Sequence, residues 1–74
     1  MTLRQMRAFL AAARLGSFSA AARALGVAQA SVSELIRKLE DEHGAAVFSR
    51  GPRRLVLTAA GTALLPFAEQ AVAA

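Results

Sequence analysis

The stretch that decides the fold runs from Ala21 to Leu39 and reads AARALGVAQASVSELIRKL. Apolar residues recur at helical spacing on both sides of Gly26, which can adopt the positive φ that ends a helix in a left-handed cap. The small Ala22 lets a second helix cross at close range, and we expect Val27 to pack the turn into the core. The stretch therefore predicts a helix-turn-helix, whose second helix can lie in a DNA major groove. An ordinary helical hairpin would show the same spacing, so the rest of the chain has to distinguish the two.

Composition and charge narrow the classes of protein that this chain can form. Its 74 residues are enough for one domain, which would bury roughly 60% of its unfolded surface. A net charge of +4 and an isoelectric point near 11.5 favour a polyanionic partner. The absence of cysteine and the single histidine exclude disulfides, thiol chemistry and a histidine–cysteine metal site. No apolar run reaches the ~20 residues of a membrane span, and no signal-peptide pattern occurs. We expect a cytoplasmic protein with no membrane partner and no cofactor.

Two helices are predicted before the turn. The first should cover about residues 3–15, because Thr2 stands three residues before a glutamine, which is the spacing of a capping box. The second should cover about residues 17–25. Ser17 or Ser19 can cap it by accepting a hydrogen bond from a backbone N–H, but the N–H groups at a helix start also bind phosphate. Both interpretations are open for each serine.

The helix after the turn, about residues 30–43, carries the candidate base-reading residues. We predict base contacts from Gln29, Ser33 and Glu34. We predict contacts to the DNA backbone from Ser31, Arg37, Lys38 and Arg50. A glutamine can pair with adenine and a carboxylate can accept from cytosine N4. Glu34 has a second possible role, because it can pair with Arg37 or Lys38 one turn further on and only orient them. The same face would also suit plain exposure to solvent.

Residues 45–58 predict a β-hairpin. Two short β-prone stretches, about residues 45–48 and 55–57, flank a charged turn. Three arginines crowd this turn: Arg50, Arg53 and Arg54. A two-stranded hairpin is not stable alone, so it must pack on the helices through Phe48 and either Leu55 or Leu57. Arginines at an exposed tip suit phosphate or minor-groove contact, and we place Arg53 and Arg54 against a flanking minor groove. A solubilising basic loop is the alternative.

The last predicted helix covers residues 59–74 and contains Pro66, which should kink it or be accommodated near its first turns. Its apolar stripe, to which Phe67 adds, consists of Leu64, Leu65, Ala68 and Val72. We predict that this stripe forms a dimer interface or continues into a linker. The alternative is that the helix folds back onto the core of its own domain.

These features together resemble the N-terminal DNA-binding domain of LysR-type transcriptional regulators, over essentially the whole chain. The segments that carry the resemblance are residues 2–6 with Phe9, 16–22, 25–27, Gln29, Ser33, 36–40, Gly44, 47–48, Arg50, 53–54, 57–58 and Gly61. The resemblance implies a mainly α winged helix-turn-helix with a three-helix core, a short two-stranded β wing and a C-terminal linker and dimerisation helix. It also implies that a small-molecule effector would act only through a C-terminal domain that is absent here.

Four departures from the family pattern bear on specificity. The family commonly has serine and proline where this chain has Ala28 and Ala30, which removes the usual cap and the proline that starts the recognition helix. Glu34 stands where a basic or amide residue is common, and an acid in the groove changes which bases are tolerated. The wing has Gly51-Pro52 in place of Thr-Gly and Val56 in place of a basic residue. We expect these changes to alter sequence preference.

The sequence thus predicts a winged helix-turn-helix over residues 1–58 and the start of a linker or dimerisation helix over 59–74, as a fragment of a longer regulator. The predicted function is sequence-specific binding of double-stranded DNA by a homodimer, in the regulation of transcription. The alternative is an alanine-rich helical module that binds proteins through a basic face. We expect no enzyme, because the sequence offers no nucleophile–base pair, paired carboxylates or metal-ligand cluster.

Overall fold

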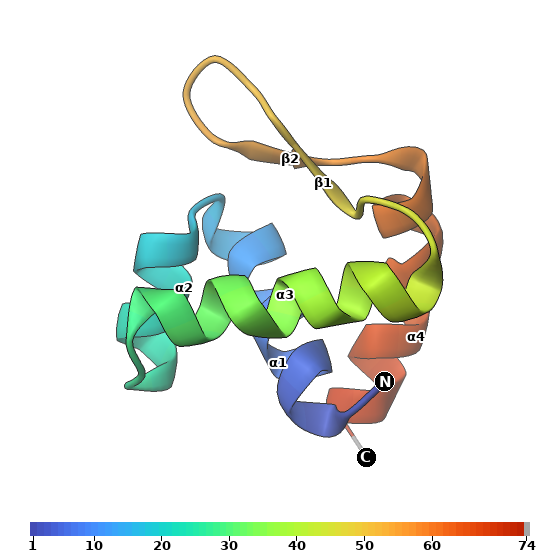
Figure 1. Cartoon of the computed structure of the whole chain (residues 1–74), viewed down its shortest axis with the longest axis horizontal. Coiled ribbons are helices and arrows are strands. Elements are labelled where there is room, and N and C mark those ends of the chain that lie inside the picture. Colours follow the sequence, from blue (N-terminus) through green and yellow to red (C-terminus); the bar gives the residue numbers. More distant parts are fainter. Residues whose placement is uncertain (74) are drawn as a thin grey trace.

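Figure 1 shows the computed structural model of the chain, which describes residues 1–73. Its elements are α1 (Leu3–Leu15), α2 (Phe18–Leu25), α3 (Gln29–His43), β1 (Phe48–Arg50), β2 (Leu55–Leu57) and α4 (Ala59–Ala73). The antiparallel hairpin of β1 and β2 stands above the helices α1, α2 and α3. The predicted architecture, mainly α with a two-stranded wing, is confirmed. The predicted last helix extended to residue 74, which lies outside the described residues.

Side chains next to the helix starts fix where the first two helices begin. The Thr2 hydroxyl accepts a hydrogen bond from the Gln5 amide at 3.1 Å, and the Gln5 side chain accepts one from the Thr2 amide at 2.8 Å, so the predicted capping box is confirmed. The Ser17 hydroxyl caps α2 by accepting from the Ala20 amide at 3.1 Å. The cap position of α3 is Ala28, which offers no side-chain acceptor. The first amides of α3 therefore stay available to another partner.

The conformation and hydrogen bonding of the backbone form the turn between α2 and α3. Gly26 takes the predicted left-handed conformation with φ of 70°. The Val27 amide donates to the Ala22 carbonyl at 3.0 Å. The prediction that Val27 packs into the core is wrong, because its side chain is 39% exposed. Ala22 in α2 and Val32 in α3 are the nearest buried residues on either side of this turn.

The wing is attached to the corner between α1 and α2. The ring of Phe48 on β1 lies 5.4 Å from the ring of Phe9 and 5.8 Å from that of Phe18, measured between centroids. The Leu55 amide on β2 donates to the Gly16 carbonyl at 2.9 Å. Phe48, Leu55 and Leu57 pack against the core, as the sequence predicts. Aromatic packing and one backbone hydrogen bond thus set the distance between the wing and α2.

Helix α4 packs on its own domain. Leu64 and Ala68 are buried in the core, and Leu65 and Val72 pack partly against it. The predicted dimer stripe is therefore wrong for Leu64 and Ala68, because side chains buried inside their own domain cannot face a second copy. Sequence periodicity identifies an apolar stripe but does not say what covers it. None of the helices within residues 1–73 is long and apolar enough to cross a membrane.

Phe67 is the large apolar side chain of α4 that is exposed, with an exposed fraction of 67%. It follows Pro66, which lies inside α4 and leaves the helix unbroken from Ala59 to Ala73. Proline lacks the amide that an interior helical residue would donate, so some local strain in the helical hydrogen bonding is expected here.

Gly61 marks the closest approach of α4 to the segment that enters the wing. A Cβ atom at this position would overlap the carbonyl oxygen of Val47 and crowd the side chain of Leu57. The Thr58 amide donates to the same Val47 carbonyl at 3.1 Å, and the Thr58 hydroxyl donates to the Ala46 carbonyl at 2.6 Å. Small size at residue 61 therefore lets α4 start directly beneath β1.

We predict that Gly61→Ala destabilises the domain. Helix propensity alone would make this change stabilising by about 1 kcal/mol, but the overlap with the Val47 carbonyl forces α4 away from the wing. Urea unfolding followed by circular dichroism measures the effect. Thr62→Ala, at an exposed neighbouring position of the same helix, is the control and should change stability little. A gain in stability for Gly61→Ala would contradict the packing described here.

Candidate nucleic-acid interface

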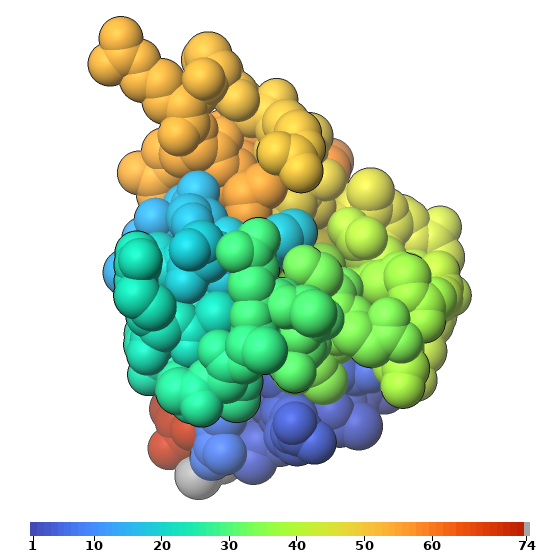
Figure 2. All heavy atoms as spheres, turned by 60° about the vertical axis from the view of Figure 1, so that its left-hand side comes forward, coloured from blue at the N-terminus to red at the C-terminus, as the bar shows by residue number. Residues whose placement is uncertain are grey.

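A groove separates the wing from α2 and the start of α3. Its volume is about 340 Å³, and it is lined by residues 16–19, 29 and 50–55. Figure 2 shows the wing overhanging α2 and α3 on this side of the molecule. The lining includes arginines of the wing, a helix start and an amide side chain, and these groups attract anions and donate hydrogen bonds. The groove is our candidate nucleic-acid interface.

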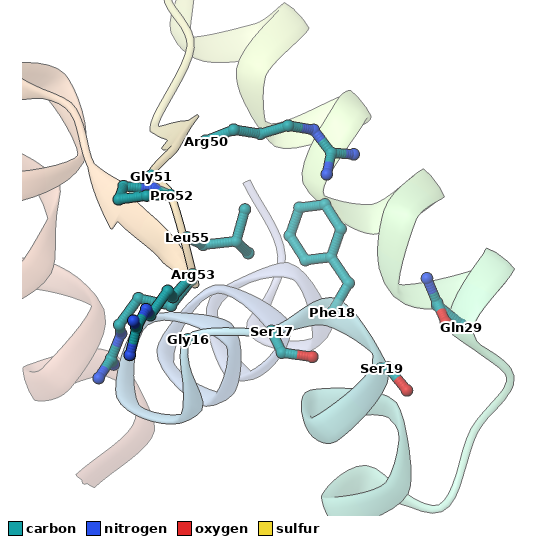
Figure 3. Close-up of a pocket in the computed structure, with 11 residues that line it drawn as sticks. Gly16, Ser17, Phe18, Ser19, Gln29, Arg50, Gly51, Pro52, Arg53 and Leu55 are labelled. Carbon is teal, nitrogen blue, oxygen red and sulfur yellow. The ribbon is translucent and has the colours of Figure 1, made fainter.

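The start of α2 forms the floor of the groove. Figure 3 shows Ser17, Phe18 and Ser19 along it, with Gln29 opposite. Ser17 is the residue that caps α2, so the capping interpretation is confirmed for this serine. Ser19 is the second residue of α2 and is exposed. Its hydroxyl, together with the partial positive charge of the helix start, remains a candidate phosphate contact.

The predicted DNA-contacting residues of α3 lie on two flanks of the helix, and this division does not follow their predicted roles. Gln29 lines the groove, and Ser33 is one turn further along the same flank. Ser31 and Lys38 lie on the other flank, where they line a second, shallow depression of about 370 Å³ together with Glu34, a predicted base reader. Arg4 of α1 also lines that depression, although it is not among the DNA-contacting residues predicted from the sequence. Only the packing of α1 beside α3 reveals this arginine.

The three wing arginines occupy different places. Arg50, at the end of β1, extends past Phe18 toward α3 (Figure 3). Arg53 is exposed in the turn between the strands. Arg54 folds back, with its guanidinium against Gly16 at the end of α1. A helix C-terminus carries partial negative charge, which suits a guanidinium. The structure thus brings Arg50 to the recognition helix and holds Arg54 on the α1 side of the wing.

Comparison with known proteins now identifies the family. The family model described as "Bacterial regulatory helix-turn-helix protein, lysR family" matches residues 3–62. The chain belongs to the LysR family. The HTH-type transcriptional regulator ShiR of Corynebacterium glutamicum (strain R) is 47% identical over 73 residues, which make up 99% of this chain and 25% of that protein. The chain thus spans about a quarter of the length of the curated relatives that it matches.

Two solved LysR-family structures are similar in fold. The one titled "Crystal structure of CbnR_DBD-DNA complex" has a TM-score of 0.88 and 37% identity, covering 95% of this chain and 80% of that one. The one titled "Crystal Structure of BenM_DBD/benA site 1 DNA Complex" has a TM-score of 0.91 and 34% identity, covering 99% of this chain and 82% of that one. The LysR family consists of bacterial regulators and is not a class of enzymes.

Acidic side chains of α3 are all engaged within the domain. Glu34 accepts two hydrogen bonds from Arg37, one from Nε at 3.0 Å and one from Nη2 at 2.8 Å. The third nitrogen of the same guanidinium, Nη1, donates to Asp41 at 2.8 Å. The hydrogen bonds from Arg37 lower the pKa of Glu34, and the carboxylate of Glu34 raises the pKa of Arg37. Glu40 accepts from the Val47 amide at 2.8 Å, and Glu42 lies 3.5 Å from the amino terminus.

These contacts bear on the role of Glu34 and on how α3 leads into the wing. Of the two roles considered for Glu34, the structure has it pairing with Arg37. Glu40 holds the chain where α3 leads into the wing. A hydrogen bond to an amide seven residues along the chain has no signature in sequence spacing, so only the fold reveals it.

We predict that Arg50→Ala weakens binding to random-sequence duplex DNA. One lost phosphate contact should lower the slope of log K against log salt by about 0.9. Fluorescence anisotropy at several salt concentrations measures this slope. Arg14→Ala is the control, because Arg14 is an equally basic surface residue that lies 3.9 Å from Glu69 of α4 and does not line the groove. Equal losses for both variants would mean that net charge, and not the groove, determines binding.

Proposed function

We propose that this chain is the DNA-binding domain of a LysR-family transcriptional regulator and binds double-stranded DNA in a sequence-specific manner. The observation that carries the proposal is the groove that brings Gln29, Arg50 and the start of α2 together on one side of the domain. The DNA complexes of the CbnR and BenM domains, which share this fold, support the same assignment. A regulator of bacterial genes would act in the cytoplasm, where the chromosome lies.

In the proposed complex, α3 lies in the major groove with its first turn against the base edges. Gln29 can pair bidentately with adenine, and the Ser33 hydroxyl can donate to or accept from a base one turn further along. Ser31 and Lys38, which line the depression on the opposite flank, would contact the phosphate backbone. Because Ala28 supplies no cap, the first amides of α3 can also bind a phosphate oxygen.

The wing would contact the DNA beside the major groove. Arg50 extends toward α3 and suits a phosphate at the edge of the recognition site. Arg53 is exposed in the turn and suits the flanking minor groove, where the potential of A·T-rich DNA attracts arginine. Arg54 lies against Gly16, so we assign it first to holding the wing in place and second to phosphate contact.

We also propose that the regulator is a homodimer that uses the outer side of α4. Phe67 is the large apolar side chain exposed there, with Leu65 and Val72 partly exposed beside the core. An effector-binding domain beyond this module would account for the greater length of the curated relatives.

Selection from a random-sequence pool tests the base-reading role. We expect Gln29→Ala to lose discrimination at one base pair of the selected site, at a cost of about 1–3 kcal/mol. Ser31→Ala, whose proposed contact is to the backbone, should select the same sequence as the wild type with weaker affinity. A wild-type chain that selects no consensus and binds with little salt dependence would instead favour the protein-binding alternative.

Sedimentation equilibrium tests the dimer. We expect the wild-type chain to associate at high concentration and Phe67→Ser to shift it toward monomer, because a large apolar side chain would be lost from the contact. Leu3→Ser is the control, since Leu3 is another exposed apolar residue, 46% exposed, on α1. A monomeric wild type, or the same shift for both variants, would contradict the proposed interface.

A further inference from the structure

The outer face of α3 carries an arginine held between two carboxylates. Glu34 and Asp41 together take three hydrogen bonds from Arg37, and these use all three nitrogens of the guanidinium. Glu34 precedes Arg37 by one turn and Asp41 follows it by one turn, so the three side chains lie along one line of the helix. We call these three residues the Arg37 clamp.

The clamp changes the charge that the recognition helix presents to DNA. Its two carboxylates and one guanidinium sum to a charge of −1 at neutral pH, and all three side chains are more than half exposed. The hydrogen bonds from Arg37 lower the pKa of Glu34 and so favour its charged form. An unpaired arginine at this position would attract a DNA phosphate regardless of the DNA sequence. In the clamp, the same arginine is surrounded by oxygen atoms that repel phosphate.

We propose that the Arg37 clamp is a specificity device: Glu34 and Asp41 withhold Arg37 from the DNA backbone and thereby weaken binding to non-specific sequences. This inference rests on the proposed DNA-binding function. It replaces the backbone contact that the sequence suggests for Arg37. In this account Glu34 and Asp41 are positioning residues that act through Arg37, and specificity increases because affinity for random DNA falls.

The free oxygen lone pairs of the clamp explain how specific DNA can still be bound. A carboxylate that receives hydrogen bonds from Arg37 can accept a further one from the amino group of cytosine or adenine. A DNA phosphate has no hydrogen-bond donor, so it can form no hydrogen bond with the carboxylates of the clamp. The clamp therefore penalises contact with the backbone and tolerates base edges that donate.

Ethylation interference tests the proposal, because it reports individual phosphate contacts and not net charge. The probe is a duplex that the wild-type chain selects from a random-sequence pool. The test variant is Glu34→Gln with Asp41→Asn, which keeps the side-chain shapes and removes both charges. The matched control is Glu42→Gln with Glu69→Gln, which removes two carboxylates of similar exposure outside the clamp. All four residues are at the surface, so folding should be retained.

The clamp variant should gain at least one phosphate whose ethylation blocks binding. It should also bind random duplex more tightly, with a slope of log K against log salt steeper by about 0.9. Adding Arg37→Gln to the clamp variant should remove the new interference. The control should show the wild-type interference pattern.

Two results would overturn the proposal while leaving the proposed function intact. One is a wild-type pattern that already contains a phosphate contact dependent on Arg37. The other is a clamp variant whose pattern matches that of the control. If the wild-type chain bound neither selected nor random DNA at any salt concentration, the proposed function itself would fail, and the inference with it.

Discussion

The hydrogen bond from the Leu55 amide to the Gly16 carbonyl, 2.9 Å long, is the constraint on which the candidate interface depends. Gly16 ends α1 in a left-handed conformation with φ of 73°, directly before the cap of α2. Gly16 therefore turns the chain toward α2 and also accepts the hydrogen bond that attaches the wing. A side chain at this position would be strained and would strike the guanidinium of Arg54, at 2.6 Å from a Cβ atom. Together with the packing of Phe48, this bond sets the width of the groove.

Local features of the fold could be predicted from the sequence because they depend on residues three or four positions apart. The capping box of Thr2 and the left-handed cap at Gly26 are examples. Features set by tertiary packing could not. The sequence does not say that Val27 stays at the surface or that Leu64 is buried in its own domain, because an apolar residue is compatible with either place. The contact of Gly61 with the Val47 carbonyl likewise joins segments that the sequence leaves independent.

The candidate site likewise has features that the sequence predicts and features that only the fold reveals. The positions of Gln29 and Arg50 follow from the helix-turn-helix and the wing, and the structure brings both to one groove. Which basic residues are available to DNA does not follow from their identity. Arg54 is held against Gly16, Arg37 is held by two carboxylates, and Arg4 lies beside α3 although it belongs to α1. Net charge and motif therefore indicate the partner, whereas side-chain contacts determine which residues reach it.

The central claim is that the groove between the wing, α2 and α3 is the surface that meets DNA. Titration of the ¹⁵N-labelled chain with a selected duplex, followed by amide chemical shifts, tests it most directly. The account predicts the largest shifts at the groove-lining amides, including those of Ser17, Gln29 and Arg50, and small shifts where Arg14 of α1 meets Glu69 of α4. Large shifts confined to that α1–α4 side, with the groove amides unmoved, would contradict it.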